Sequence, residues 1–92
     1  MPKINTTNSF ERDYLTCFKK HRNLELLDKI ILLLEHSGTL PVKYKPHKLK
    51  GKWSGHNECH VEDDWLLIYY LKSQNEITLV RTGSHDELFK KR

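Results

Sequence analysis

The first third of the chain carries apolar residues at helical spacing. One face is formed by side chains that recur every three to four positions: Phe10, Tyr14, Cys17 and Phe18. This period predicts a helix from Ser9 to Lys20. Asn8, followed three positions later by Glu11, has the pattern of an N-cap with a reciprocal acid.

A second helix is predicted after the polar break at 21–23. Its apolar face has four members at helical spacing: Leu24, Leu27, Ile31 and Leu34. Asn23 is the expected N-cap, and Gly38 is the expected C-terminal stop. Because this segment is the most apolar part of the chain, we expect it to be the central core helix.

The remaining pattern predicts strands. They are expected at 3–6, loosely at 53–62, and then at 65–71 and 76–81. The run at 65–71 is almost continuously apolar, as in an interior strand. Ser84 and Glu87 form a capping box that predicts a short helical turn beginning at His85. The order β-α-α-β-β-β predicts an α+β fold, with two helices packed on one face of a small antiparallel sheet, in a single domain over 1–92.

The composition limits the classes of protein. A chain of 92 residues is too short for a multi-domain enzyme with a separate cofactor domain. The apolar runs at 30–34 and 65–71 are far short of the roughly 20 residues that span a membrane. The N-terminus lacks the apolar core of a signal peptide, so we expect a cytoplasmic protein with no membrane partner. Cys17 and Cys59 are then expected as reduced, semi-buried thiols.

The net charge of +4 is unevenly distributed. Residues 1–56 hold eleven Lys and Arg against five acids, whereas residues 57–92 hold five against seven. The sharpest basic segment is 41–56, which contains no acid and five lysines: Lys43, Lys45, Lys48, Lys50 and Lys52. Tyr44 and Trp53 lie among them. Ammonium groups interleaved with aromatic rings favour binding of RNA phosphates and bases, with Lys48, Lys50 and Lys52 as phosphate candidates. A solvated basic loop is the alternative.

Polar side chains alternate along the segment that follows. If 56–64 is extended, five ionisable residues point to one face: His56, Glu58, His60, Glu62 and Asp64. They form either a solvated face or a site for general acid–base chemistry. A metal site is disfavoured, because Cys59 would point away from the two histidines and no C-x-x-C or H-E-x-x-H motif is present.

Histidine and aspartate beside phosphate-binding residues suit RNA cleavage. A 2′-hydroxyl must lose a proton, charge on the phosphate must be stabilised, and the leaving 5′-oxygen must gain a proton. No metal or other cofactor is required. His85, at the start of the terminal turn, is a further candidate. Arg81 is a candidate for binding phosphate, or alternatively a partner for a surface acid.

Three segments of the chain resemble the YafQ branch of the RelE/ParE toxins. The first is His47-x-Leu49-x-Gly51-x-Trp53, the second runs from Glu58 to Tyr69, and the third runs from Arg81 to Phe89. The resemblance covers essentially the whole chain and includes the RelE-like order of elements. It implies a toxin of a type II toxin–antitoxin system.

The resemblance also implies a function and a set of site residues. Such toxins are ribosome-dependent endoribonucleases that cut translated mRNA in the ribosomal A-site, against ribosomal RNA, and are held inactive by a cognate antitoxin. Operator DNA would be bound only through the antitoxin complex. The catalytic positions fall on four residues: His47, His60, Asp64 and His85. Trp65 and Phe89 are implied neighbours of the substrate, with Asp64 or His60 as base and His85 as acid.

One position departs from the family pattern. An arginine is often found two residues before the position of Cys59, and here that residue is Asn57. The missing cation leaves Arg81 or a loop lysine to stabilise the phosphate. Two alternatives stay open: a catalytically weak module that pairs with an antitoxin and represses its operon, and a ParE-like inhibitor of DNA gyrase. The gyrase alternative needs no acid–base set.

Overall fold

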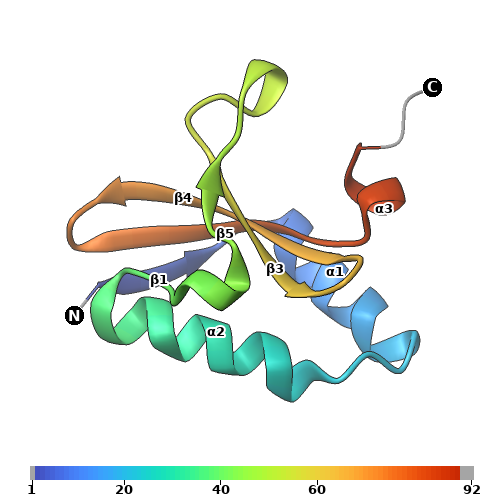
Figure 1. The fold of residues 1–92 in the computed structure, drawn as a ribbon. Helices are drawn as coiled ribbons and strands as arrows, with labels where there is room; N and C mark the ends of the chain where they lie inside the picture. The colour runs from blue at the N-terminus through green and yellow to red at the C-terminus, as the bar shows by residue number, and fades with distance from the viewer. Residues whose placement is uncertain (1, 90–92) are drawn as a thin grey trace.

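A computed structural model of the protein describes residues 2–89 (Figure 1). Its centre is one five-stranded sheet in the order β1-β5-β4-β3-β2. The strands are Lys3–Thr6 (β1), His47–Lys48 (β2), Asn57–Glu62 (β3), Trp65–Ser73 (β4) and Glu76–Gly83 (β5). The predicted α+β class is confirmed, and the predicted elements occur in the expected order, with the short strand β2 added. The sheet is mixed rather than purely antiparallel, because β1 runs parallel to β5. The long connection that a parallel pair requires contains the two helices and the strands β2, β3 and β4.

Two helices follow β1, and their ends agree closely with the sequence pattern. They are α1 (Asn8–Lys19) and α2 (Leu24–Ser37). Asn23 caps α2 by accepting the backbone N–H of Glu25, and Gly38 ends it in a left-handed conformation with φ of 77°. The predicted cap of α1 is wrong by one residue. Thr7, not Asn8, accepts the N–H of Phe10, and its hydroxyl also donates to a carbonyl of β5.

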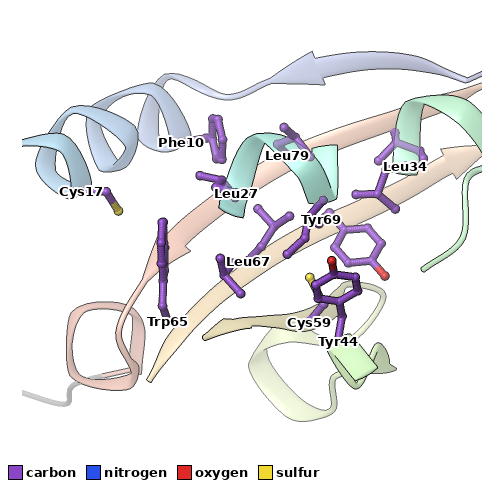
Figure 2. Close-up of a cluster of buried hydrophobic side chains, with 13 residues drawn as sticks. Phe10, Cys17, Leu27, Leu34, Tyr44, Cys59, Trp65, Leu67, Tyr69 and Leu79 are labelled. Carbon is purple, nitrogen blue, oxygen red and sulfur yellow. The ribbon is translucent and has the colours of Figure 1, made fainter. Parts of the chain in front are cut away.

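The first five residues of β4, 65–69, are buried on both faces, as the apolar run predicts, whereas 70–73 are exposed. Leu67 and Tyr69 pack into the cluster under α1 and α2, together with side chains of β3 and β5 (Figure 2). Leu66 and Ile68 point to the other face, where Leu88 covers them. The long helices α1 and α2 therefore occupy only one side of the sheet (Figure 1). We call the other side, which these two helices leave uncovered, the open face.

The basic segment is more ordered than a loop. It contains two 3-10 turns, Val42–Tyr44 (η1) and Gly51–Trp53 (η2), with the short strand β2 between them. Sequence periodicity did not predict β2. Its two residues pair antiparallel with β3, with His47 opposite Glu58 and Lys48 opposite Asn57. Leu49 and Trp53 of this segment pack on the open face beside Leu66 and Ile68.

The terminal helix α3 (His85–Phe89) begins where the capping box predicts. The Ser84 hydroxyl accepts the N–H of Glu87, and a Glu87 carboxylate oxygen accepts the N–H of Ser84. The predicted thiols are both free and buried, and burial raises the pKa of Cys59 to about 12. Among residues 2–89, no helix has the length and apolar character needed to cross a membrane.

Truncating the interior of β4 should test the packing on the helix side. Leu67 has no exposed surface, so Leu67→Ala should lower the free energy of unfolding by about 3 kcal/mol. Leu71→Ala is the matched control, because that side chain is 44% exposed on the same strand and should cost below about 1 kcal/mol. Urea denaturation measures the free energy of unfolding of both variants. Equal losses in the two variants would contradict the burial of Leu67 under the helices.

Candidate active site

The open face carries a row of aromatic rings contributed by distant parts of the chain. His60 lies between two histidines, with ring centroids 6.3 Å from His47 and 6.4 Å from His85. The row continues from His85 to Phe89 at 6.2 Å and from Phe89 to Trp53 at 6.2 Å. Three of the four predicted catalytic residues therefore lie side by side, on three different elements.

The alternation of β3 explains why its chemistry faces away from the helices. Cys59 and Val61 belong to the core cluster under α1 and α2, so Glu58 and His60 point to the open face. The predicted common face is confirmed for these two residues. Glu58 is only 5% exposed, so it is not part of a solvated surface. The register of β3 with β4 shifts between His60 and Glu62, and the following turn holds Asp64.

Asp64 and His85 form the first of two histidine–carboxylate pairs. The Asp64 Oδ1 lies 2.6 Å from His85 Nδ1 and also accepts the His85 backbone N–H at 3.1 Å. The side-chain hydrogen bond from His85, followed by the backbone one, lowers the pKa of the Asp64 carboxyl. An ionised carboxylate only accepts, so the proton of the pair lies on Nδ1. The other ring nitrogen, Nε2, is left for proton exchange with a bound molecule.

His47 and Glu58 form the second pair. The His47 Nε2 lies 3.1 Å from Glu58 Oε1, and its Nδ1 lies 2.8 Å from the backbone oxygen of Lys45. The antiparallel register of β2 with β3 places the two residues directly opposite each other. The contact between Glu58 and His47 could not be predicted from the sequence, because β2 was not predicted. Only the pairing of β2 with β3 shows which carboxylate faces His47.

His60 differs from both neighbours. Within the described part of the chain, no hydrogen bond joins its ring to another residue. It borders a hollow of about 510 Å³ that three lysines also line: Lys29, Lys43 and Lys45. Lys29 comes from α2 and was not among the predicted residues. The predicted Lys48, Lys50 and Lys52 lie exposed along the segment from β2 to η2.

Two predicted substrate contacts are corrected by the structure. Trp65 is 2% exposed, its Nε1–H donates to Thr82 Oγ1 at 3.0 Å, and the Arg22 guanidinium lies 5.9 Å from its ring. The Trp65 ring is therefore buried in the core and is not exposed for contact with a substrate. Arg81 points to the helix side and binds Asp13 with two hydrogen bonds of 2.6 and 3.1 Å. The alternative interpretation of Arg81, as the partner of an acid, is the observed one.

Glu87 fixes the helix that carries His85 and Phe89. Its carboxylate accepts from Lys20, from Arg22 at 3.1 Å and from the Ser84 backbone at 2.8 Å. Partial burial opposes its ionisation, but the hydrogen bonds from Lys20, Ser84 and Arg22 prevail and lower the pKa of Glu87 to about 2. The carboxylate also packs against Gly83, where an added Cβ would lie 2.7 Å from Glu87 Oε1. The start of α3 is thereby anchored to the end of α1.

No group of three or more His, Cys, Asp and Glu side chains among residues 2–89 is arranged to hold a metal ion. Each of the two carboxylates contacts a different histidine. Glu58 pairs with His47 and Asp64 pairs with His85, on either side of His60. The arrangement is instead suited to proton transfer at an exposed surface, with histidines in different hydrogen-bonding states.

Comparison with known proteins agrees with this fold. A family model described as "Bacterial toxin of type II toxin-antitoxin system, YafQ" matches residues 2–90. The mRNA interferase toxin YafQ of Escherichia coli K12 is 36% identical over 87 residues, which cover 94% of each chain. YafQ in the E. coli DinJ-YafQ toxin-antitoxin complex superposes with a TM-score of 0.87 at 35% identity, covering 96% of this chain and 97% of that one.

A copper-bound mutant toxin from Helicobacter pylori superposes equally well, with a TM-score of 0.88 at 37% identity, covering 97% of this chain and all of that one. Fold and sequence together define a bacterial toxin of a type II toxin–antitoxin system. Within that class, the chain belongs to the YafQ family.

The contacts of the Glu87 carboxylate predict how the stability of the protein changes at acid pH. The pKa of Glu87 in the folded protein, about 2, lies below its ordinary value of 4.5. The ionised carboxylate therefore contributes its full stability above about pH 4.5, and the contribution is lost as the pH falls toward about 2. Glu87→Gln should cost about 1 kcal/mol near neutral pH, after allowance for solvent screening.

Urea denaturation at several pH values measures this effect. The difference between the native sequence and Glu87→Gln should narrow as the pH is lowered from about 5 to about 3. Glu35→Gln, at an exposed position on α2, is the control and should change the free energy of unfolding by less than about 0.5 kcal/mol. A difference that is constant with pH would show that Glu87 does not stabilise the protein through its charge.

Proposed function

We propose that this protein is a ribosome-dependent endoribonuclease that cleaves translated mRNA without a metal ion. The observation that carries the proposal is the row of three histidines, with carboxylates behind the two outer ones, on a face that the helices leave open. Family membership supports it, because the curated E. coli relative is named an mRNA interferase.

The hydrogen bonds of the three histidines suggest how the proton transfers are divided. His60, whose ring has no partner among the described residues, is the proposed base that takes the proton of the 2′-hydroxyl. The 2′-oxygen then attacks phosphorus and the bond to the 5′-oxygen breaks. His85 is the proposed acid, because Asp64 holds a proton on its Nδ1 side and leaves Nε2 to protonate the departing 5′-oxygen. Asp64 orients His85 rather than acting as the base.

Other groups along the row suit an RNA strand. Phe89 and Trp53 meet edge to face at the end of the row, and Phe89 is available to stack against a base. Lys48, Lys50 and Lys52 extend from the exposed segment beside β2 and would neutralise phosphates. The hollow lined by Lys29, Lys43 and Lys45 gives the strand a second basic path next to His60.

The small size of the protein is consistent with a substrate that is positioned by the ribosome rather than by the protein itself. The site is an exposed row of side chains rather than a deep cleft, with the His85 side chain 54% exposed. A ribosome would supply the positioning that the chain lacks, by holding the message in its A-site against ribosomal RNA. A cognate antitoxin is the proposed partner, since the E. coli relative forms the DinJ-YafQ complex, and operator DNA would be bound only through that complex.

The preserved acid–base geometry favours the nuclease over the two alternatives. A module that acts only by pairing with an antitoxin requires neither oriented histidines nor a carboxylate behind each outer one. The same holds for an inhibitor of DNA gyrase on this fold. Replacement of the family arginine by Asn57 is the feature that favours a weak relative, and Asn57 is buried between β2 and β4 rather than facing the row.

Replacing single histidines should separate catalysis from folding. His60→Gln and His85→Gln should each lower cleavage of mRNA on purified ribosomes by about 100-fold or more, because each removes one proton transfer. Primer extension that maps new 5′ ends measures the cuts, and thermal unfolding checks the fold. His36→Gln, at an exposed position on α2, is the control and should cut normally. Full activity in both site variants would rule out the assignment.

A further inference from the structure

The row of histidines lacks an obvious cation for the phosphate. Cleavage of RNA concentrates negative charge on the phosphate, and a fixed positive group beside it is needed to stabilise that charge. Arg81 is bound to Asp13 on the helix side, and Arg22 is bound to Glu87. Asn57 carries no charge. Among the residues in the row itself, the histidines are the side chains that can carry a positive charge.

We propose that Glu58 is a positioning residue that keeps His47 doubly protonated, so that His47 is the cation beside the scissile phosphate. This inference rests on the proposed nuclease function and names the group that stabilises the phosphate in it. His47 lies at one end of the histidine row, with its ring centroid 6.3 Å from that of His60. A phosphate bridging these two rings would contact both the base and the cation.

The hydrogen-bond partners of His47 support a ring with a proton on each nitrogen. The Nδ1 of His47 faces the backbone oxygen of Lys45 at 2.8 Å, and a carbonyl oxygen can only accept. The Nε2 faces Glu58 Oε1 at 3.1 Å, and an ionised carboxylate can only accept. With Glu58 ionised, both contacts are hydrogen bonds only if each ring nitrogen of His47 carries a proton.

Burial of Glu58 decides where the second proton lies. Its side chain is 7% exposed, and His47 is its one ionic partner among the described residues. A buried carboxylate without a positive partner is strongly disfavoured, whereas a carboxylate paired with an imidazolium is compensated. The His47 side chain is 47% exposed, so water solvates the positive member of the pair. The solvated imidazolium and the buried carboxylate form the favoured combination.

The surroundings of His47 contain few competing charges. From β3 it faces Glu58 and His60, and among residues 2–89 no other side chain forms an ion pair with its ring. Lys45 and Lys48 flank it on its own segment. These positive neighbours oppose a second charge on His47. Removal of the Glu58 charge should therefore favour the singly protonated ring.

Glu58→Gln tests the proposal, because the amide has the shape of the carboxylate and can donate to a neutral Nε2. Glu62→Gln is the matched control at an exposed position on the same strand. Ring ¹⁵N NMR of the free protein near pH 7.5 should show protons on both nitrogens of His47 in the native sequence and in Glu62→Gln, and on one nitrogen in Glu58→Gln. A neutral His47 ring in the native sequence would overturn the proposal without any variant.

Cleavage on ribosomes gives the second readout. Glu58→Gln should cut about tenfold more slowly than the native sequence near pH 7.5, and the ratio should shrink near pH 6, where an unpaired imidazole is largely protonated. A purely structural role for Glu58 would give a ratio that does not change with pH. Equal rates for Glu58→Gln and the native sequence would overturn the proposal. If the native sequence does not cut at all, the proposed function fails, while the NMR result still decides the role of Glu58.

Discussion

The alternation of side chains along β3 determines where this protein can do chemistry. Cys59 and Val61 are drawn into the core beneath the helices, which forces Glu58 and His60 to the opposite side of the sheet. Both helices lie against the first side, so nothing of comparable size covers the second (Figure 1). The aromatic row and its carboxylates then assemble on the open face from β2, β3 and α3.

Ion pairing divides the charged groups of the protein by function. The two arginines near the site are bound to acids: Arg81 ties α1 to β5 through Asp13, and Arg22 ties the end of α1 to α3 through Glu87. Their charges hold elements of the fold together. Two other carboxylates, Glu58 and Asp64, are paired with histidines. The charges that face a ligand are therefore those of histidines and surface lysines, which suits proton transfer on RNA.

Sequence alone predicted much of the fold because its signals are local. Periodicity located both helices to within about a residue at most ends, and the capping pair of Ser84 and Glu87 located α3. The two-residue strand β2 is too short to produce a pattern, so the facing of His47 and Glu58 could not be foreseen. Likewise, the partner of Arg81 is Asp13, which lies 68 residues away, and no local signal connects them.

Only part of the candidate site was predicted, because contacts between residues far apart in the sequence leave no local signal. His47, His60, Asp64 and His85 were identified by residue type and by resemblance, and the structure brings them together. Trp65 has the residue type of a stacking platform, but its position in β4 directs it into the core (Figure 2). Lys29 was missed because a helix surface reveals its neighbours only after α2 is packed against β3.

The chemistry of the RNA ends tests the central claim most directly. Attack by the 2′-oxygen, with histidines moving the protons, predicts a 2′,3′-cyclic phosphate on one fragment and a 5′-hydroxyl on the other. The ends of mRNA cut on purified ribosomes should be determined by mass spectrometry and by labelling with polynucleotide kinase. Cyclic phosphate and 5′-hydroxyl ends are the predicted result. Fragments with a 5′-phosphate and a 3′-hydroxyl would contradict the account.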